Sequence, residues 1–220
     1  MPRVGVASPA MTSGVIFDLD GTLGDTLPVC FEAFRVVFSE FLDVRYQDDE
    51  IRAMFGPTEE GILAARIPGY DGLPMDRFLE VYGGAHGLAA NPFPGMLDLL
   101  DRLADTGVRL AVVTGKGRRS ADLSLRHWGI HERFDPIEAG SDTGNVKARN
   151  MRRVLDVWDL APSAVVSVGD VVSDVEAARA VGIVPLAAAW ASTANPTELV
   201  AAGPDAVFTR VAELTGWLDL

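Results

Sequence analysis

Short apolar runs of strand length recur along the chain, and each is followed at once by small or acidic residues. The three clearest runs are Val15 to Phe17, Leu110 to Val113 and Val165 to Val168. A helix-like stretch follows the second run over Arg118 to Trp128, and another follows the third over Val171 to Val181. Strands that alternate with helices in this way predict a parallel sheet with helices on both sides.

Three weaker strand candidates, at 137–139, 184–188 and 206–208, extend the same pattern. Together the runs predict an α/β fold with a Rossmann-like, doubly wound parallel sheet as its core.

The segment from Leu27 to Leu88 interrupts the alternation, because it contains several helical stretches and no convincing strand. It is also too long for an ordinary connection between a strand and the next element. We therefore predict an inserted all-helical cap over residues 26–91. Phe31, Phe34, Phe38 and Phe41 or Leu42 recur at helical spacing. We interpret this stripe as the cap's own core rather than as a cofactor site.

This interpretation divides the chain into a leader, a cap and a core. Residues 1–14 lack the apolar stretch of a signal peptide and are predicted to be a flexible leader. The catalytic core is predicted over 15–25 and 92–220. Pro92 and Pro94 stiffen the linker that returns the chain to it.

Composition and charge narrow the class of partner. The chain has 220 residues, of which 48% are hydrophobic and 23% charged, as in an ordinary globular protein. Its net charge of -12 argues against nucleic acid or an anionic membrane as a partner. A single cysteine, Cys30, excludes an internal disulfide and fits a reducing compartment, so we expect a cytoplasmic protein. The oligomeric state cannot be inferred from these features.

Two carboxylates, Asp18 and Asp20, follow the first strand and point to the same side if the alternation continues. Like charges about 4 Å apart repel by roughly 4 kcal/mol at an effective dielectric constant near 20. A divalent cation relieves that repulsion, and magnesium prefers such oxygen ligands. The alternative is a strand end whose acids only form a turn. A calcium-binding loop is disfavoured, because Gly21 comes directly after the second acid.

Other polar residues lie where the second and third strands end. The second strand ends in Thr114, Gly115 and Lys116, and the third in Gly169 and Asp170. Ligands of parallel α/β sheets bind at the carboxyl ends of the strands, where the strand order reverses. We therefore expect these residues to lie at one edge of the sheet.

The residue types suggest separate roles in phosphoryl transfer. Asp18 is the candidate nucleophile, and Asp20 the candidate acid and base. Thr114, the Gly115 N–H and Lys147 are candidates for binding the phosphate oxygens. The chain has only two lysines, and both fall in these motifs. A solvated position on a helix is the alternative for Lys147.

The same residues suggest a metal site. Asp170 completes a ligand set with Asp18 and the backbone carbonyl of Asp20. Asp174, close to the start of a helix, either orients those ligands or caps the helix.

Four motifs in order resemble those of the haloacid dehalogenase-like hydrolase superfamily: D-L-D-G-T at 18–22, V-V-T-G-K at 112–116, Lys147, and G-D-V-V-S-D at 169–174. With the helical insertion, they resemble its phosphoglycolate phosphatase-like branch. The resemblance implies magnesium-dependent hydrolysis of a small phosphorylated metabolite through an aspartyl-phosphate.

The resemblance also separates branches of the superfamily. Asp20 distinguishes the chain from the dehalogenases proper, while sugar phosphomutases share this acid and stay an alternative. Phe55 to Gly61 looks like the cap loop that helps to choose the substrate, which makes Thr58 and Glu59 candidate substrate-binding residues. One departure is Ala148, where the family commonly has proline after the lysine.

Two alternatives come from other functional classes. A phospho-acceptor receiver also gathers acids, a threonine and a lysine at strand ends. It is shorter, however, and has no large insertion after the first strand. The other is a scaffold with this fold and no activity, against which the complete set of polar residues argues.

Overall fold

Six parallel strands form a single sheet in the computed structural model, which describes residues 12–220. The strand order is β3-β2-β1-β4-β5-β6. The strands are β1 (Gly14–Phe17), β2 (Arg109–Val113), β3 (Ile137–Glu138), β4 (Val165–Gly169), β5 (Val184–Ala188) and β6 (Ala206–Phe208).

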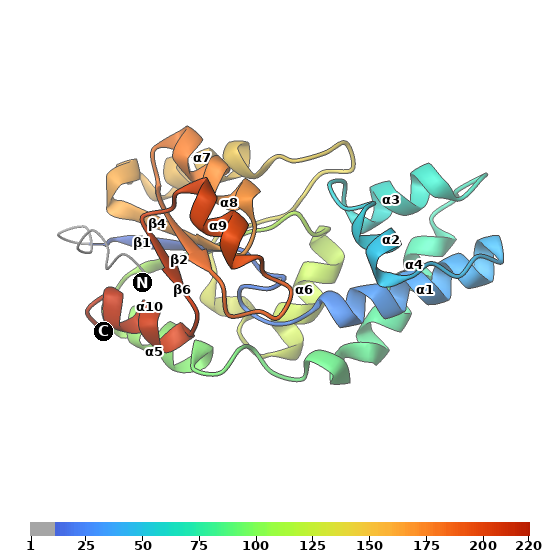
Figure 1. Cartoon of the computed structure of the whole chain (residues 1–220), viewed down its shortest axis with the longest axis horizontal. Helices are drawn as coiled ribbons and strands as arrows, with labels where there is room; N and C mark the ends of the chain where they lie inside the picture. The colour runs from blue at the N-terminus through green and yellow to red at the C-terminus, as the bar shows by residue number, and fades with distance from the viewer. Residues whose placement is uncertain (1–11) are drawn as a thin grey trace.

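Helices fill most of the intervals between strands, as Figure 1 shows. The α-helices are α1 (Leu27–Leu42), α2 (Asp48–Arg52), α3 (Glu59–Arg66), α4 (Leu73–Gly84), α5 (Met96–Asp105), α6 (Arg118–His127), α7 (Lys147–Trp158), α8 (Val172–Val181), α9 (Pro196–Ala202) and α10 (Val211–Trp217). Short 3₁₀-helices are η1 (Ala85–Ala89), η2 (His131–Arg133) and η3 (Pro162–Ala164). Among the described residues, none of the helices is both long and apolar enough to cross a membrane.

The predicted fold class is confirmed, and all six predicted strand regions form strands. The first strand begins at Gly14, one residue earlier than expected, because Gly14 pairs with Arg109 on β2 and Val165 on β4. The predicted leader therefore overlaps β1 at its last residue. Residues 1–11 of that leader lie outside the described part of the chain.

The sheet is buried on both faces, and alternate residues of β1 serve different layers. Val15 and Phe17 belong to the apolar layer formed with α5 and α6. Ile16 belongs to the layer formed with α7 and α8. Because both faces are covered, the carboxyl ends of the strands are where polar groups can gather around a ligand.

The central strand β1 lies between β2 and β4, so the strand order reverses beside it. From β1 the chain proceeds through β2 to β3 on one side, and then through β4 to β5 and β6 on the other. A crevice therefore opens at the carboxyl ends of these central strands. The residues that follow β1, β2 and β4 converge on it.

Residues 26–91, here called the helical insertion, contain α1 to α4 and η1 and no strand. In Figure 1, α1 to α4 lie at one end of the molecule and the sheet lies at the other. Phe34 and Phe38 of α1 stack with ring centroids 5.6 Å apart, and Phe34 meets Phe78 of α4 at 4.8 Å. The aromatic stripe therefore packs within the insertion, as its spacing predicts.

Replacing Phe38 tests this aromatic core. Phe38 is fully buried and packs against Phe34 and Tyr46. We expect Phe38→Ala to lower the free energy of unfolding by about 3–5 kcal/mol, because it leaves a cavity between the helices. Phe41→Ala is the control, since Phe41 is 40% exposed and should change stability by less than about 1 kcal/mol. Denaturant unfolding measures both, and similar losses would contradict the assignment.

Candidate active site

Asp18 is the first residue after β1, and its carboxylate is buried with one oxygen held and one free. Its backbone N–H donates to the Val168 carbonyl at 2.9 Å, which continues the parallel pairing of β1 with β4. Its Oδ2 accepts a hydrogen bond from Lys147 Nζ at 3.0 Å. Its Oδ1 is buried and has no hydrogen-bond partner among the described residues. This oxygen is therefore available to a cation or to a reacting group.

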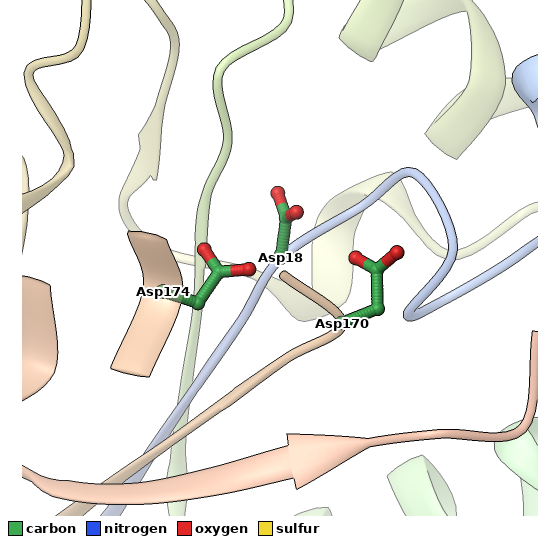
Figure 2. Close-up of side chains that lie close together, drawn as sticks. All are labelled: Asp18, Asp170 and Asp174. Carbon is green, nitrogen blue, oxygen red and sulfur yellow. The ribbon is translucent and has the colours of Figure 1, made fainter. Parts of the chain in front are cut away.

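Three carboxylates meet at this point, as Figure 2 shows. Asp170 directly follows β4, and Asp174 lies in the first turn of α8. Ligand oxygens of these two residues and Asp18 lie within 4.8 Å of one another. All three residues are buried. An all-oxygen set of this kind suits a hard divalent cation.

The turn after β1 has the shape that Asp170 needs. Gly21 has a φ of +77°, and a Cβ there would lie only 2.2 Å from Asp170 Oδ2. The next residue, Thr22, donates its hydroxyl to Asp170 Oδ1 at 3.3 Å. Glycine followed by threonine in D-L-D-G-T therefore lets the turn pack directly against the carboxylate of the third motif.

Burial raises the pKa of Asp18 and raises that of Asp170 well above its usual range. The charges of neighbouring carboxylates raise both pKa values further, while Lys147 lowers them. One lysine thus does not compensate for the gathered acids. A divalent cation would supply the missing positive charge.

Lys147 is the first residue of α7 and lies between two of the carboxylates. Its Nζ is 3.0 Å from Asp18 Oδ2 and 2.5 Å from Asp174 Oδ1. Burial lowers the pKa of Lys147, but Asp174 and Asp18 raise it more, so the ammonium stays charged. The start of α7 is held without the family's proline, because Asn145 Oδ1 accepts the Lys147 backbone N–H at 2.9 Å.

Asp174 uses both oxygens within the protein. Oδ1 binds Lys147, and Oδ2 accepts the Val171 backbone N–H at 3.2 Å at the start of α8. These contacts favour the role of an orienting residue, which stays a prediction.

Thr114 and Gly115 follow β2 and offer donors to an anion. Thr114 Oγ1 accepts the Lys116 backbone N–H at 3.1 Å, which leaves the hydroxyl proton to be donated elsewhere. No described residue accepts the N–H of Gly115. The loop after β3 approaches closely, because a Cβ on Gly140 would lie 2.0 Å from the Gly115 carbonyl oxygen. Both free donors belong to residues that line the cavity described below.

Asp20 lies apart from the carboxylate cluster. The hydroxyl of Thr26 donates to its Oδ1, and Lys116 Nζ lies 3.4 Å from the same oxygen. No described residue donates to its Oδ2. The two acids of the first motif therefore have different environments, as their different predicted roles require. The predicted metal contact through the Asp20 carbonyl stays a prediction.

Thr58 and Glu59 connect the helical insertion to the core. Thr58 donates its backbone N–H to the Ser141 carbonyl at 3.1 Å and its hydroxyl to Asp142. Glu59 Oε1 lies 3.0 Å from Lys116 Nζ and accepts the Ser120 hydroxyl at 2.7 Å. Both residues are buried. Their predicted contact with substrate stays a prediction.

One cavity of about 360 Å³ lies between the insertion and the sheet. It is lined by eight of the nine predicted site residues, namely Asp18, Asp20, Thr58, Glu59, Thr114, Gly115, Lys147 and Asp170. Asp174 lies behind them and is not part of the wall. The fold therefore brings together residues from four sequence motifs and from the insertion.

Sequence reasoning gave no role to several residues that build this site. They are Thr26, Lys116, Ser120, Gly140 and Asp142. Lys116 carried one signal, because it is one of two lysines and follows Thr114 and Gly115 in its motif. Ser120, Gly140 and Asp142 make contacts between segments distant in sequence, which no local pattern indicates. Thr26 contacts Asp20 six residues earlier, and its spacing alone carries no signal for that hydrogen bond.

Residues 15–188 match the model of the haloacid dehalogenase-like hydrolase family, so the chain belongs to this family. The match includes all four motifs and the insertion. It confirms the resemblance and sets aside the receiver alternative.

Particular relatives refine this assignment. Phosphoglycolate phosphatase of Rhodospirillum rubrum is 29% identical, over 94% of this chain and 91% of its own. Tyrosine-protein kinase PtkA of Mycobacterium tuberculosis is 35% identical over 80% of this chain, which spans 62% of that relative. A crystal structure of a CbbY mutant from Rhodobacter sphaeroides, in complex with xylulose-(1,5)bisphosphate, has a TM-score of 0.80 at 24% identity. The structural match covers 96% of this chain and 100% of the CbbY chain. The phosphoglycolate phosphatase-like branch is thereby supported, and the last match shows the shared fold.

The raised pKa values predict how pH and a cation affect stability. Asp18 and Asp170 retain protons in the folded state at pH values where the unfolded chain has lost them. Unfolding then releases protons, so the metal-free protein loses stability as pH rises above the ordinary carboxylate range. A cation at about 100 times its Kd should raise Tm by about 5–10 °C near pH 7.5, and less near pH 5.

Thermal unfolding with and without MgCl₂ at both pH values measures this effect. Asp170→Asn is the matched variant, because it removes one titrating group and one ligand. It should reduce both the pH dependence and the cation-induced shift. A shift in Asp170→Asn equal to that of the wild type would contradict the assignment.

Proposed function

We propose that this protein is a magnesium-dependent phosphatase that hydrolyses a small-metabolite phosphate monoester through an aspartyl-phosphate on Asp18. The observation that carries this proposal is the buried carboxylate of Asp18, which lines the cavity and whose Oδ1 has no hydrogen-bond partner among the described residues. Membership of the hydrolase family and the phosphoglycolate phosphatase relatives support it.

In the first step, Asp18 Oδ1 attacks the phosphorus atom and the leaving-group oxygen departs. Lys147 holds the other oxygen of Asp18 and so fixes the direction of attack. The Thr114 hydroxyl and the Gly115 N–H are free to donate to the phosphoryl oxygens, where charge develops. Asp20 supplies a proton to the leaving oxygen through its free Oδ2.

In the second step, Asp20 removes a proton from a water molecule, and the water oxygen attacks the phosphorus of the aspartyl-phosphate. The bond to Asp18 breaks, the carboxylate is regenerated and inorganic phosphate leaves. Asp20 thereby regains the proton that it gave in the first step, so the cycle closes.

Magnesium fits the carboxylates of Asp18 and Asp170, with the Asp20 carbonyl as the third predicted protein ligand and Asp174 orienting the set. When bound, it would neutralise charge on the carboxylates and on the transferring phosphoryl group. The hard oxygen donors and the uncompensated negative charge support this choice of metal.

The cations at the cavity favour a phosphatase over the phosphomutase alternative. A mutase transfers a phosphoryl group between two positions and must bind a species that carries two phosphates. Three cationic residues line the cavity within the described chain: Lys147, Lys116 and Arg52. Lys147 and Lys116 each contact two carboxylates. Of these three cations, Arg52 is the one that makes no ion pair with a described residue.

Arg52 is the residue that we propose reads the leaving group. It lines the cavity from α2, with its guanidinium 5.4 Å from the centroid of the Phe31 ring. A single unpaired guanidinium suits one carboxylate on the substrate. We therefore propose a small cytoplasmic metabolite that bears one phosphate and one further anionic group. Phosphoglycolate, the substrate in the names of several relatives, is the first to test.

Variants of the two acids test the mechanism. Asp18→Asn should lower turnover of 4-nitrophenyl phosphate by more than about 1,000-fold without unfolding the protein, because only the nucleophile is lost. Asp20→Ala should lower kcat by about 100-fold or more. It should lower kcat/KM for this substrate by less than about tenfold, because its leaving group needs little protonation. Steady-state kinetics measure all these values, and an active Asp18→Asn enzyme would overturn the proposal.

Arg52→Ala tests the leaving-group contact. We expect kcat/KM for phosphoglycolate to fall by about tenfold or more, because a charge-assisted hydrogen bond is lost. The kcat/KM for 4-nitrophenyl phosphate should stay within about twofold, since this substrate has no carboxylate for Arg52 to contact. Arg66→Ala is the matched control, because Arg66 is exposed on α3 and does not line the cavity. Equal effects on both substrates would refute the contact.

A further inference from the structure

Lys116 is a buried cation at the junction of the insertion, the sheet and the first motif. Its Nζ lies 3.0 Å from Glu59 Oε1 and 3.4 Å from Asp20 Oδ1. On another side it lies 4.6 Å from the centroid of the Tyr82 ring. An ammonium has three N–H donors. Two carboxylates and one aromatic face occupy its surroundings, so this cation serves the protein's own carboxylates rather than substrate.

Both carboxylate oxygens of Glu59 accept hydrogen bonds from residues of the core. Its Oε2 accepts the Gly117 backbone N–H at 2.7 Å, and its Oε1 accepts the Ser120 hydroxyl at 2.7 Å. Gly117 is the residue before α6, so the carboxylate lies at the positive end of that helix. A Cβ on Gly117 would lie 2.8 Å from Glu59 Oε2. The first residue of α3 is thus docked on the start of α6 and holds Lys116 in place.

These contacts fix the orientation of the Asp20 carboxylate. Lys116 and Thr26 both contact its Oδ1, and its Oδ2 has no partner among the described residues. Asp20 lines the cavity. A carboxylate with one oxygen fixed in this way has a defined orientation. A misplacement of about 1 Å at a reacting group can cost about 100-fold in rate.

We propose that Lys116 and Glu59 are positioning residues for the acid and base Asp20, and that their ion pair makes this position depend on docking of the insertion. Substrate chemistry is then efficient only when α3 is seated on α6. This inference rests on the proposed phosphatase function and adds two residues to its machinery. Neither residue forms a bond to the substrate in this account.

The variant that tests the proposal removes both charges at once. Lys116→Met together with Glu59→Gln keeps the side-chain volumes, and the amide oxygen of the introduced glutamine can still accept the Gly117 N–H. The double variant removes the buried ion pair between Lys116 and Glu59 as a unit, so neither partner of that pair is left without the other. Glu60→Gln is the matched control, because Glu60 follows in the same helix and accepts the Tyr70 hydroxyl within the insertion. Circular dichroism and Tm establish that each variant is folded.

The readout is the ratio of kcat/KM for ethyl phosphate to kcat/KM for 4-nitrophenyl phosphate. An alkyl leaving group needs a proton from Asp20, whereas nitrophenolate leaves without one. We expect the double variant to lower this ratio by about tenfold or more, and Glu60→Gln to leave it unchanged. A structural role alone would lower both values in parallel, and a parallel loss or an unchanged ratio would overturn the proposal.

Adding the double substitution to Asp20→Ala sharpens the test. The ratio should not fall further in that background, because the residue being positioned is already absent. A further fall would show that Lys116 acts without Asp20 and would overturn the proposal. If the folded wild type hydrolysed neither substrate, the proposed phosphatase function itself would be wrong, which is a different outcome from an active wild type with an unchanged ratio.

Discussion

The crowding of buried carboxylates at the end of β1 is the constraint on which the site depends. Carboxylate oxygens of Asp18, Asp170 and Asp174 lie within 4.8 Å of one another. Burial raises the free energy of their ionised forms. Lys147 compensates for part of this charge through two direct contacts. In the proposed function, a divalent cation would neutralise the remainder. The same repulsion that lowers the stability of the metal-free protein would then favour binding of that cation.

The fold imposes this crowding through its topology. β1 lies between β2 and β4, and the strand order reverses beside it, so three strand ends deliver polar residues to one crevice. The glycine turn after β1 then allows Asp170 to approach without a steric clash. The insertion covers the crevice and contributes Glu59, whose partner Lys116 belongs to the motif after β2. The two acids of the first motif thus receive different surroundings, Asp18 from the sheet and Asp20 partly from the insertion.

The sequence predicted the parts of this arrangement that local patterns encode. Apolar runs indicated the six strands, and the missing alternation between Leu27 and Leu88 indicated the helical insertion. The sequence also predicted that the strand ends carrying Asp18, Thr114 and Asp170 meet at one edge of the sheet, because parallel strands share one carboxyl edge. All three residues line the cavity. The ion pair between Lys116 and Glu59 was not predicted, since it joins residues 57 positions apart through the docking of α3 on α6. Nor was the close approach of Gly140 to Gly115, which depends on how two loops meet in space.

The central claim is that Asp18 becomes covalently phosphorylated during turnover. Acid quenching of the protein within a single turnover of 4-nitrophenyl phosphate, followed by peptide mapping by mass spectrometry, tests it most directly. The account predicts a phosphoryl group on the peptide that contains Asp18, accumulating further when Asp20 is replaced by alanine. Release of inorganic phosphate with no phosphoryl group on Asp18, at times shorter than one turnover, would contradict it.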